Sequence, residues 1–289
     1  MERPSLLGRR LGEFEVVEPL GEGGYGDVFR AHQAKLERDA VIKVLKTTIG
    51  PIAEERFTRE AKLASQLDHP YAAHVYAYGA EPDGVRWIAM ELVRGSTLAE
   101  LLGTQGAMPL SRFLPLFEAL CQVVHAAHER SIVHRDIKPA NVMVVVRGGV
   151  LYPKLLDFGI ARLATFEDSV QSDQVEQRVD RLLAAAETAH AAGNGAAGAE
   201  LDAFDRELDR LFEERRGEQA ATARDRAPGV SDELYVGSPE YMAPELWLGP
   251  HSAGPACDIY ALGVLAFECL SGDSPFRGRH IVETARAHL

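Results

Sequence analysis

The stretch HRDIKPANV, residues 134–142, decides how the fold of this chain is interpreted. It places a single carboxylate, Asp136, between the cations Arg135 and Lys138, and an amide, Asn141, follows. Apolar runs enclose these residues, with SIV before them and VMVVV after them. A solvated charge cluster does not usually lie between two strand-like runs. The sequence therefore predicts that these side chains carry chemistry, and the alternative is an ordinary buried ion-pair cluster.

Length and composition indicate a globular chain with a sizeable core. The chain has 289 residues, too many for one small domain, so we expect one large bilobal domain. The apolar share of 46% and the charged share of 26% are ordinary for a soluble protein. The net charge of −12 argues against a general nucleic-acid-binding function.

The cysteines and the apolar runs bear on the compartment. Cys121, Cys257 and Cys269 are odd in number and form no CxxC pair, which is typical of free thiols in a reducing compartment. The N-terminus lacks the apolar core of a signal peptide. The apolar run IYALGVLAFECL is too short to cross a bilayer and contains Glu268. We expect a soluble, cytoplasmic chain with no membrane segment of its own. Whether a membrane anchor follows Leu289 stays open.

The first 93 residues predict a small, mostly β lobe with one helix. Strands are expected over residues 14–46, interrupted by a glycine cluster. A helix follows from Pro51, and its predicted apolar face is Phe57, Ala61, Ala64 and Leu67. Two more strands, HPYAAHVYAYGA and VRWIAMELV, are joined by the turn EPDG.

Residues 94–289 predict a second, mainly helical lobe. Helical patterns cover STLAELL and residues 110–131, and a hairpin is expected around residues 147–149. The chain becomes helical again from about residue 240. Between the predicted hairpin at 147–149 and this last helical part, at about residues 164–232, the sequence has two Ala-rich helical patterns separated by GNGAAG. They predict an inserted helical hairpin.

The glycine cluster GEGGYGDV, residues 21–28, is suited to bind phosphate. Its glycines let the backbone approach an anion closely, with N–H groups facing it. A glycine-rich turn and a dinucleotide fingerprint are the alternatives, but the strand expected after Gly26 argues against the second. Lys43 is either a solvent-facing strand residue or a phosphate-binding ammonium, with Glu60 as its natural carboxylate partner.

Seven segments in order resemble the eukaryotic-type protein kinases, specifically the serine/threonine branch and its bacterial members. They are GEGGYGDV, VIK, the helix residue Glu60, HRDIKPAN, DFG, GSPEYMAPE and CDIYALG. The resemblance implies an α+β bilobal fold, with a small antiparallel β N-lobe over residues 1–93 and a mainly α C-lobe over 94–289. It places the insert in the activation segment, between DFG and APE.

The resemblance implies ATP and Mg²⁺ as cofactors and assigns the chemical roles. Asp136 would accept or orient the proton of the attacking hydroxyl, and Lys138 would neutralise charge on the transferred phosphoryl group. Asn141 would bind one Mg²⁺ and Asp157 the principal one. Phosphoryl transfer needs mainly positioning and electrostatic stabilisation, which these residue types supply.

The nucleotide site implied by the resemblance draws on both lobes. Lys43 pairs with Glu60 and binds the phosphates, Met90 is the gatekeeper, and residues 91–93, here called the hinge, hydrogen-bond the adenine through their backbone. The implied nucleotide-binding residues are Gly21, Glu22, Gly23, Gly24, Tyr25, Gly26, Val28, Val41, Lys43, Met90, Glu91, Val93 and Met143.

Other residues have structural or regulatory roles in the family pattern. His134 would pack against Phe158, and Asp258 would receive hydrogen bonds from the backbone near Arg135. Lys138 and Ser238, the latter contacting Asp136 and Lys138, indicate the serine/threonine branch. Arg135 would bind a phosphorylated activation-segment residue, for which Ser231 is favoured. The candidates for that residue are Thr165, Ser169, Ser172, Thr222 and Ser231.

Three features depart from the family pattern. Val41 stands where Ala is usual, which narrows the adenine site slightly. Asp157 and Glu245 lie 88 positions apart, farther than usual, because of the insert. The sequence ends near the start of the next expected helix, so the C-lobe is expected to be incomplete and the Arg that would pair with Glu245 to be absent. Apolar surface on the helix that carries Asp258 would then be uncovered.

Three functions compete. The leading one is an active Mg²⁺-ATP-dependent serine/threonine kinase that also phosphorylates itself. The second is a nucleotide-binding pseudokinase or scaffold whose catalysis was lost with the C-lobe helices and the insert. The third is a small-molecule phosphotransferase, which normally lacks a segment like GSPEYMAPE. The insert is either a tolerated surface insertion or a regulatory hairpin that docks a partner or self-associates.

Overall fold

The computed structural model describes residues 6–23, 26–45, 51–158, 238–248, 254–278 and 281–288. The predicted helical hairpin at 164–232 and all five candidate phosphorylation sites lie outside the described residues. Within the described residues, no helix is both long and apolar enough to cross a membrane.

The N-terminal part is a six-stranded antiparallel sheet. The strand order is β1-β2-β3-β4-β6-β5. The turn at residues 81–84 and strands β2, β3, β4 and β6 agree with the sequence prediction, whereas β1 was not predicted and β5 begins at Val75, after the predicted start at His69. The bounds are β1 (Arg10–Leu11), β2 (Phe14–Gly23), β3 (Gly26–Gln33), β4 (Arg38–Leu45), β5 (Val75–Ala80) and β6 (Arg86–Glu91).

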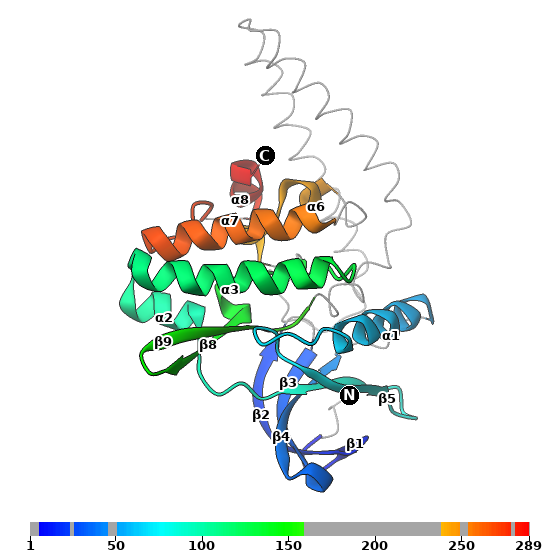
Figure 1. Cartoon of the computed structure of the whole chain (residues 1–289). Helices are drawn as coiled ribbons and strands as arrows, with labels where there is room; N and C mark the ends of the chain where they lie inside the picture. The colour runs from blue at the N-terminus through cyan, green and yellow to red at the C-terminus, as the bar shows by residue number, and fades with distance from the viewer. Residues whose placement is uncertain are drawn as a thin grey trace, which may run out of the picture.

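A single helix, α1 (Pro51–Ser65), accompanies this sheet, and Figure 1 shows it beside the strands, close to β5. Pro51 is its first residue, where a missing N–H costs nothing. The predicted apolar face is confirmed, because Phe57, Ala61, Ala64 and Leu67 are all buried. They join the core that continues into the second part of the chain, so the helix is held by packing rather than by propensity alone.

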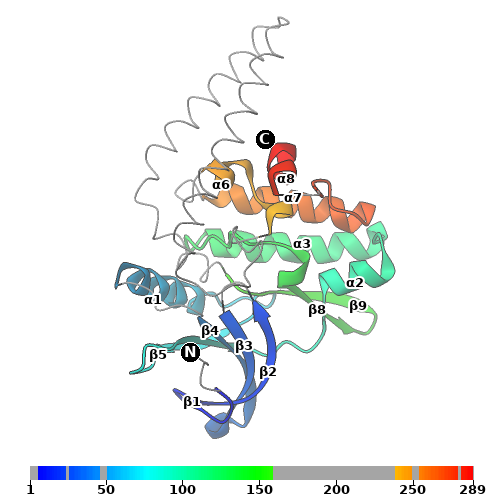
Figure 2. The same ribbon diagram turned by 180° about the vertical axis from the view of Figure 1, so that it is seen from behind.

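The second part is mainly helical, as expected. A small sheet, β7-β8-β9, lies under α3, and α3 lies between the β8–β9 hairpin and α7 in both views (Figures 1 and 2). Helix α8 follows the segment SGDSPFRG, at the place where the sequence predicted the start of a helix. The bounds are β7 (Ser96–Thr97), α2 (Leu98–Gln105), α3 (Leu110–His128), β8 (Val142–Arg147), β9 (Val150–Leu155), α6 (Pro244–Leu248), α7 (Pro255–Ser271) and α8 (Ile281–His288).

The hairpin predicted around residues 147–149 is confirmed by β8 and β9. Gly148 and Gly149 join the strands with φ of 57° and 82°, values that suit glycine. The strands pair from Val142↔Leu155 to Arg147↔Val150. This register matters for the site, because β8 follows the loop that carries Asp136 and β9 leads directly to Asp157.

One continuous apolar core joins the two parts of the fold. It runs from α1 and Met90 through α2 and α3 to Leu262 and Leu265 on α7. A second cluster, with Phe14 and Trp87, fills the other face of the N-terminal sheet. Ile259 and Phe267 on α7 are 59% and 52% exposed.

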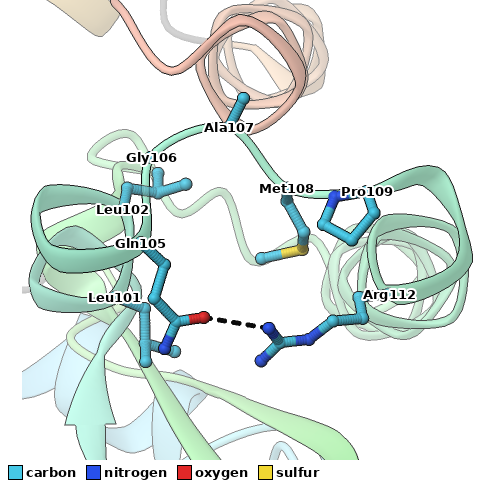
Figure 3. Close-up of a pocket in the computed structure, with 8 residues that line it drawn as sticks. All are labelled: Leu101, Leu102, Gln105, Gly106, Ala107, Met108, Pro109 and Arg112. Carbon is cyan, nitrogen blue, oxygen red and sulfur yellow. Dashed lines mark hydrogen bonds between the residues drawn. The ribbon is translucent and has the colours of Figure 1, made fainter.

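A cavity of about 100 Å³ lies between α2 and the start of α3 (Figure 3). Gln105 and Arg112 face each other across it, with Arg112 Nη1 donating to Gln105 Oε1 at 2.9 Å. None of the residues that line it belongs to the predicted nucleotide or catalytic site. The lining residues are Leu101, Leu102, Gln105, Gly106, Ala107, Met108, Pro109 and Arg112.

A buried carboxylate on α7 holds the loop over residues 134–141, here called the catalytic loop. Asp258 is 1% exposed and accepts from the backbone N–H groups of His134 and Arg135 at 2.8 and 2.7 Å. His128 Nε2 lies 2.8 Å from the same carboxylate. Arg135 has a φ of 64°, an unusual value for a non-glycine residue, so the hydrogen bonds fix a strained turn. The predicted contact of Asp258 with this backbone is confirmed.

The protonation state of Asp258 follows from these contacts. Burial raises the pKa of its carboxyl, but the hydrogen bonds from His128 and from the two backbone N–H groups outweigh burial and leave the pKa below its ordinary value. A carboxyl with a lowered folded-state pKa stabilises the fold at pH values above its unfolded-state pKa of about 4. That stabilisation is lost as the pH falls through the lowered value.

The glycines of the β2–β3 hairpin have different spatial requirements. A Cβ on Gly26 would lie 2.2 Å from the carbonyl oxygen of Val44, so β3 approaches β4 at a distance that only glycine allows. A Cβ on Gly21 would meet nothing within 4 Å. Gly26 is therefore required by the sheet itself, whereas Gly21 borders open space.

Replacing Asp258 tests the importance of the buried carboxylate. We expect Asp258→Asn to lower the free energy of unfolding by about 3 kcal/mol, because buried donors lose a charged acceptor. As the pH falls below about 4, the free energy of unfolding should also decrease less in this variant than in the parent. Urea denaturation at several pH values measures both. Asp273→Asn is the control, since Asp273 is an exposed acid paired with Arg277, and it should leave the midpoint unchanged. Equal midpoints for the two variants would contradict this role.

Alanine substitutions at Gly26 and Gly21 distinguish a glycine packed against a neighbouring strand from a glycine that borders open space. Gly26→Ala should lower the free energy of unfolding by about 2 kcal/mol, because the new methyl group overlaps the β4 backbone. Gly21→Ala should show no such loss. Thermal denaturation followed by circular dichroism makes the comparison, and a Gly26→Ala variant as stable as the parent would show that the strands are not in this register.

Candidate active site

The polar side chains of the catalytic loop converge on Asp136. Lys138 Nζ lies 2.9 Å from Asp136 Oδ2, and Asn141 Nδ2 donates to the same oxygen at 2.8 Å. Asn141 Nδ2 also donates to the Asp136 carbonyl oxygen at 2.8 Å. The Asp136 and Lys138 side chains are 15% and 19% exposed, so their charges interact with little screening. The three residues that the sequence singled out thus form one cluster.

His134 ties this loop to the segment after β9. Its Nδ1 accepts from the backbone N–H of Asp136 at 3.3 Å, so Nε2 carries the proton and donates to the carbonyl of Leu156 at 2.7 Å. Its ring packs against Phe158 with centroids 4.9 Å apart, which confirms the predicted contact. The imidazole therefore acts as a structural link between two segments rather than as an exposed base.

Asp157 and Lys43 form an ion pair across the two parts of the fold. Lys43, on β4, places its Nζ 3.2 Å from Asp157 Oδ2. Asp157 has a φ of 52°, and the preceding Leu156 donates its N–H to the carbonyl of Asn141 at 2.8 Å. This backbone bond sets Asp157 beside the catalytic loop, so the two predicted metal ligands, Asn141 and Asp157, come from adjoining segments.

Glu60 projects from α1, with its side chain 13% exposed, and Arg59 Nη2 lies 3.2 Å from its Oε1. The pairing of Lys43 with Glu60 stays a prediction. Ser238 is partly exposed, and its backbone carbonyl accepts from the N–H of Tyr241. Its contact with Asp136 and Lys138 likewise stays a prediction.

The predicted adenine-binding residues lie on neighbouring strands. Val41 pairs with Met90 between β4 and β6, and Val28 on β3 pairs with Lys43 on β4. Met90 is buried, while Val28, Val41 and Met143 are partly exposed. Met143 lies on β8, directly after the catalytic loop.

The glycine-rich segment forms the end of the β2–β3 hairpin. Gly21 and Gly23 pair with Val28 and Gly26, so the expected strand after Gly26 is present. Gly24 and Tyr25 lie outside the described residues. The dinucleotide fingerprint requires a helix after its last glycine, so the β3 strand excludes it here.

The hinge is attached to the loop before β5 through Glu91. The Glu91 N–H donates to the carbonyl of His74 at 2.9 Å. Lys154, on β9, binds the Glu91 carboxylate at 2.8 Å.

The sequence analysis missed Lys154 and His128, whose partners are 63 and 130 positions away. The one local signal for Lys154 was its position in the segment KLLDFG, three residues before Asp157.

The donor set fits Mg²⁺. Asn141 directs its amide nitrogen to Asp136, which leaves its amide oxygen as the available ligand atom, and Asp157 adds a carboxylate. Among the described residues, no group of three or more His, Cys, Asp and Glu side chains could hold a metal by itself. Two protein oxygens are the number that Mg²⁺ uses when phosphate oxygens and water complete its shell.

Comparisons with known proteins agree with this geometry. Residues 14–188 and 221–289 match the protein kinase domain. Serine/threonine-protein kinase pkn2 of Myxococcus xanthus is 32% identical over 269 residues, covering 92% of this chain and 25% of that protein. Serine/threonine-protein kinase PrkC of Bacillus subtilis is 29% identical over 287 residues, covering 98% of this chain and 34% of that protein. The chain thus spans a quarter to a third of these two relatives.

Solved structures show the same fold. The kinase domain of Mycobacterium tuberculosis PknI superposes with a TM-score of 0.59 at 23% identity, covering 93% of this chain and 78% of that chain. The α+β bilobal architecture agrees with the matched domain. The chain therefore belongs to the protein kinase family, in its eukaryotic-type bacterial serine/threonine branch.

Proposed function

We propose that this chain is a Mg²⁺-ATP-dependent serine/threonine protein kinase that acts on protein hydroxyls, including its own. The observation that carries the proposal is the cluster of Asp136, Lys138 and Asn141 beside Asp157. The names of the bacterial relatives support the same reaction. The proposed lobes are residues 1–93 and 94–289, and the proposed location is the cytoplasm.

In the proposed reaction, the oxygen of a serine or threonine hydroxyl attacks the γ-phosphorus of ATP. A bond forms between them, and the bond from the γ-phosphorus to the β,γ-bridging oxygen breaks, releasing ADP. Asp136 orients the hydroxyl and receives its proton, and Lys138 neutralises charge on the phosphoryl group in transfer. Mg²⁺, when bound, neutralises phosphate charge. Asn141 and Asp157 would hold it.

The nucleotide would lie between the two parts of the fold. Val28, Val41 and Met143 would contact the adenine faces, and the hinge backbone its edge. Lys43 would bind phosphate oxygens, and Glu60 would keep its ammonium in position. In the described structure Lys43 Nζ lies 3.2 Å from Asp157 Oδ2, and this closeness of the proposed phosphate-binding cation to a proposed metal ligand supports the assignment.

The choice of protein hydroxyls rests on two residues. Lys138 stands two positions after Asp136 and contacts its carboxylate, as expected of the serine/threonine branch. Ser238 lies in the segment GSPEYMAPE, which would receive a peptide, and a small-molecule phosphotransferase normally lacks that segment. The proposed partners are ATP and proteins with exposed serine or threonine, and residues 164–232 are the proposed regulatory or self-associating insert.

Asp136→Asn should abolish phosphate transfer and leave nucleotide binding intact. We expect transfer of labelled γ-phosphate from Mg²⁺-ATP to the chain itself and to a generic basic protein to fall by about 10³-fold or more, because the proton acceptor is lost. Asp273→Asn, far from the cluster, is the matched control. Transfer that survives in Asp136→Asn would refute the assigned role. A folded parent that binds ATP without transfer would indicate the pseudokinase instead.

Lys43→Met should weaken ATP binding and transfer together, because the ammonium contacts the phosphates. We expect the ATP-induced rise in melting temperature of the parent to be nearly lost in this variant, since a ligand stabilises a protein only in proportion to its occupancy. Lys35→Met is the control, because Lys35, in the turn between β3 and β4, forms an exposed ion pair with Glu13 in the turn between β1 and β2. A full ATP response in Lys43→Met would show that the nucleotide binds elsewhere.

A further inference from the structure

Lys154 on β9 joins three segments that are distant in the sequence. Its Nζ donates to the Glu91 carboxylate at 2.8 Å and to the carbonyl of Ala72 at 3.1 Å. Ala72 lies in the loop before β5, and Glu91 ends β6 and begins the hinge. One side chain from the second part of the fold therefore holds two segments of the first.

The Glu91 side chain is fixed from a second direction. Its Oε2 also accepts from the backbone N–H of His74 at 3.3 Å, and the Glu91 N–H donates to the His74 carbonyl at 2.9 Å. Lys154 and Glu91 side chains are 23% and 28% exposed, so their charge-assisted contact is partly shielded from water. The four groups form a closed hydrogen-bonded cluster, here called the hinge clamp: Lys154, Glu91, Ala72 and His74.

The backbone around Lys154 is held independently of its side chain. Leu155 donates its N–H to the carbonyl of Tyr71 at 2.8 Å, and its own carbonyl accepts from Ala73 at 2.9 Å. Leu156 donates to the carbonyl of Asn141. Shortening the Lys154 side chain would therefore leave the approach to Asp157 in place and would release mainly the Glu91 carboxylate.

We propose that Lys154 is a positioning residue that presets the hinge for adenine, by holding the Glu91 carboxylate against the loop before β5. This inference rests on the proposed function, since it assigns the hinge to the nucleotide. The clamp removes motion of the hinge before ATP arrives, so the cost of ordering it is not subtracted from the binding free energy. Its loss weakens ATP binding and has little effect on the chemical step.

The effect on kinetics separates positioning from plain stabilisation. A lysine that only stabilises the fold changes the unfolding midpoint and leaves the affinity of the folded chain for ATP unchanged. A lysine that presets the hinge changes the dissociation constant and KM for ATP. Loss of this charge-assisted pair predicts a rise of about tenfold in both constants. The change in kcat is expected to stay below about threefold.

The variants are Lys154→Met, Lys154→Arg and Glu91→Gln, measured on the full chain by calorimetric titration with Mg²⁺-ATP and by steady-state transfer kinetics. Lys154→Arg keeps the cation and should recover most of the affinity. The double variant Lys154→Met/Glu91→Gln should be no weaker than the worse single variant, because the two changes break one contact. Lys35→Met removes a more exposed Lys–Glu pair, which lies in turns of the N-terminal part, and should leave ATP affinity unchanged.

The result expected is weakened ATP binding in Lys154→Met and Glu91→Gln, recovery in Lys154→Arg and non-additivity in the double variant. An unchanged dissociation constant in folded Lys154→Met would overturn the proposal, and so would additive effects of the two substitutions. A raised kcat would also overturn it, because the clamp would then oppose the active arrangement. The binding readout needs no phosphate transfer, so a parent that binds ATP without transferring phosphate counts against the proposed function alone.

Discussion

The arrangement of the active site depends on one buried carboxylate. Asp258 on α7 accepts from the backbone of His134 and Arg135 and from the ring of His128, and it holds Arg135 at a φ that few side chains adopt. The catalytic loop that carries Asp136 starts from this anchored turn. Because α7 belongs to the central core, packing around this helix fixes the position of the proposed catalytic groups, although they lie on a loop.

A series of hydrogen bonds and one ion pair then connects the catalytic loop to Asp157 and Lys43. His134 binds the carbonyl of Leu156, Leu156 binds the carbonyl of Asn141, and Asp157 follows directly and meets Lys43 on β4. Each link is a hydrogen bond or an ion pair between segments that are distant in sequence. The N-terminal sheet is thus connected to the second part of the fold by charged groups as well as by the apolar core, and these groups include the predicted metal ligands.

Much of this could be predicted from the sequence. Local patterns located the strands, the β8–β9 hairpin and the buried face of α1, because alternation and helical spacing report which side chains face a core. The ordered kinase segments also predicted the contacts of His134 and Asp258. The clamp between Lys154 and Glu91 could not be predicted, because it depends on how two strands meet in space and no local signal marks it. Whether Glu60 reaches Lys43 also stays a prediction for this reason, since it depends on the position of α1.

The ion pair between Lys43 and Asp157 has a consequence for ligand entry. In the described structure the cation that would meet phosphate and the carboxylate that would meet metal already neutralise each other at 3.2 Å. Under the proposed function, arrival of Mg²⁺-ATP would be an exchange of ionic partners, in which this internal contact is given up as two contacts with the ligand form. Part of the electrostatic gain is offset by that loss. Under the proposed function, such a cleft would favour the metal–nucleotide complex over the bare nucleotide, because a bare nucleotide that draws Lys43 away leaves the Asp157 carboxylate without its counter-charge.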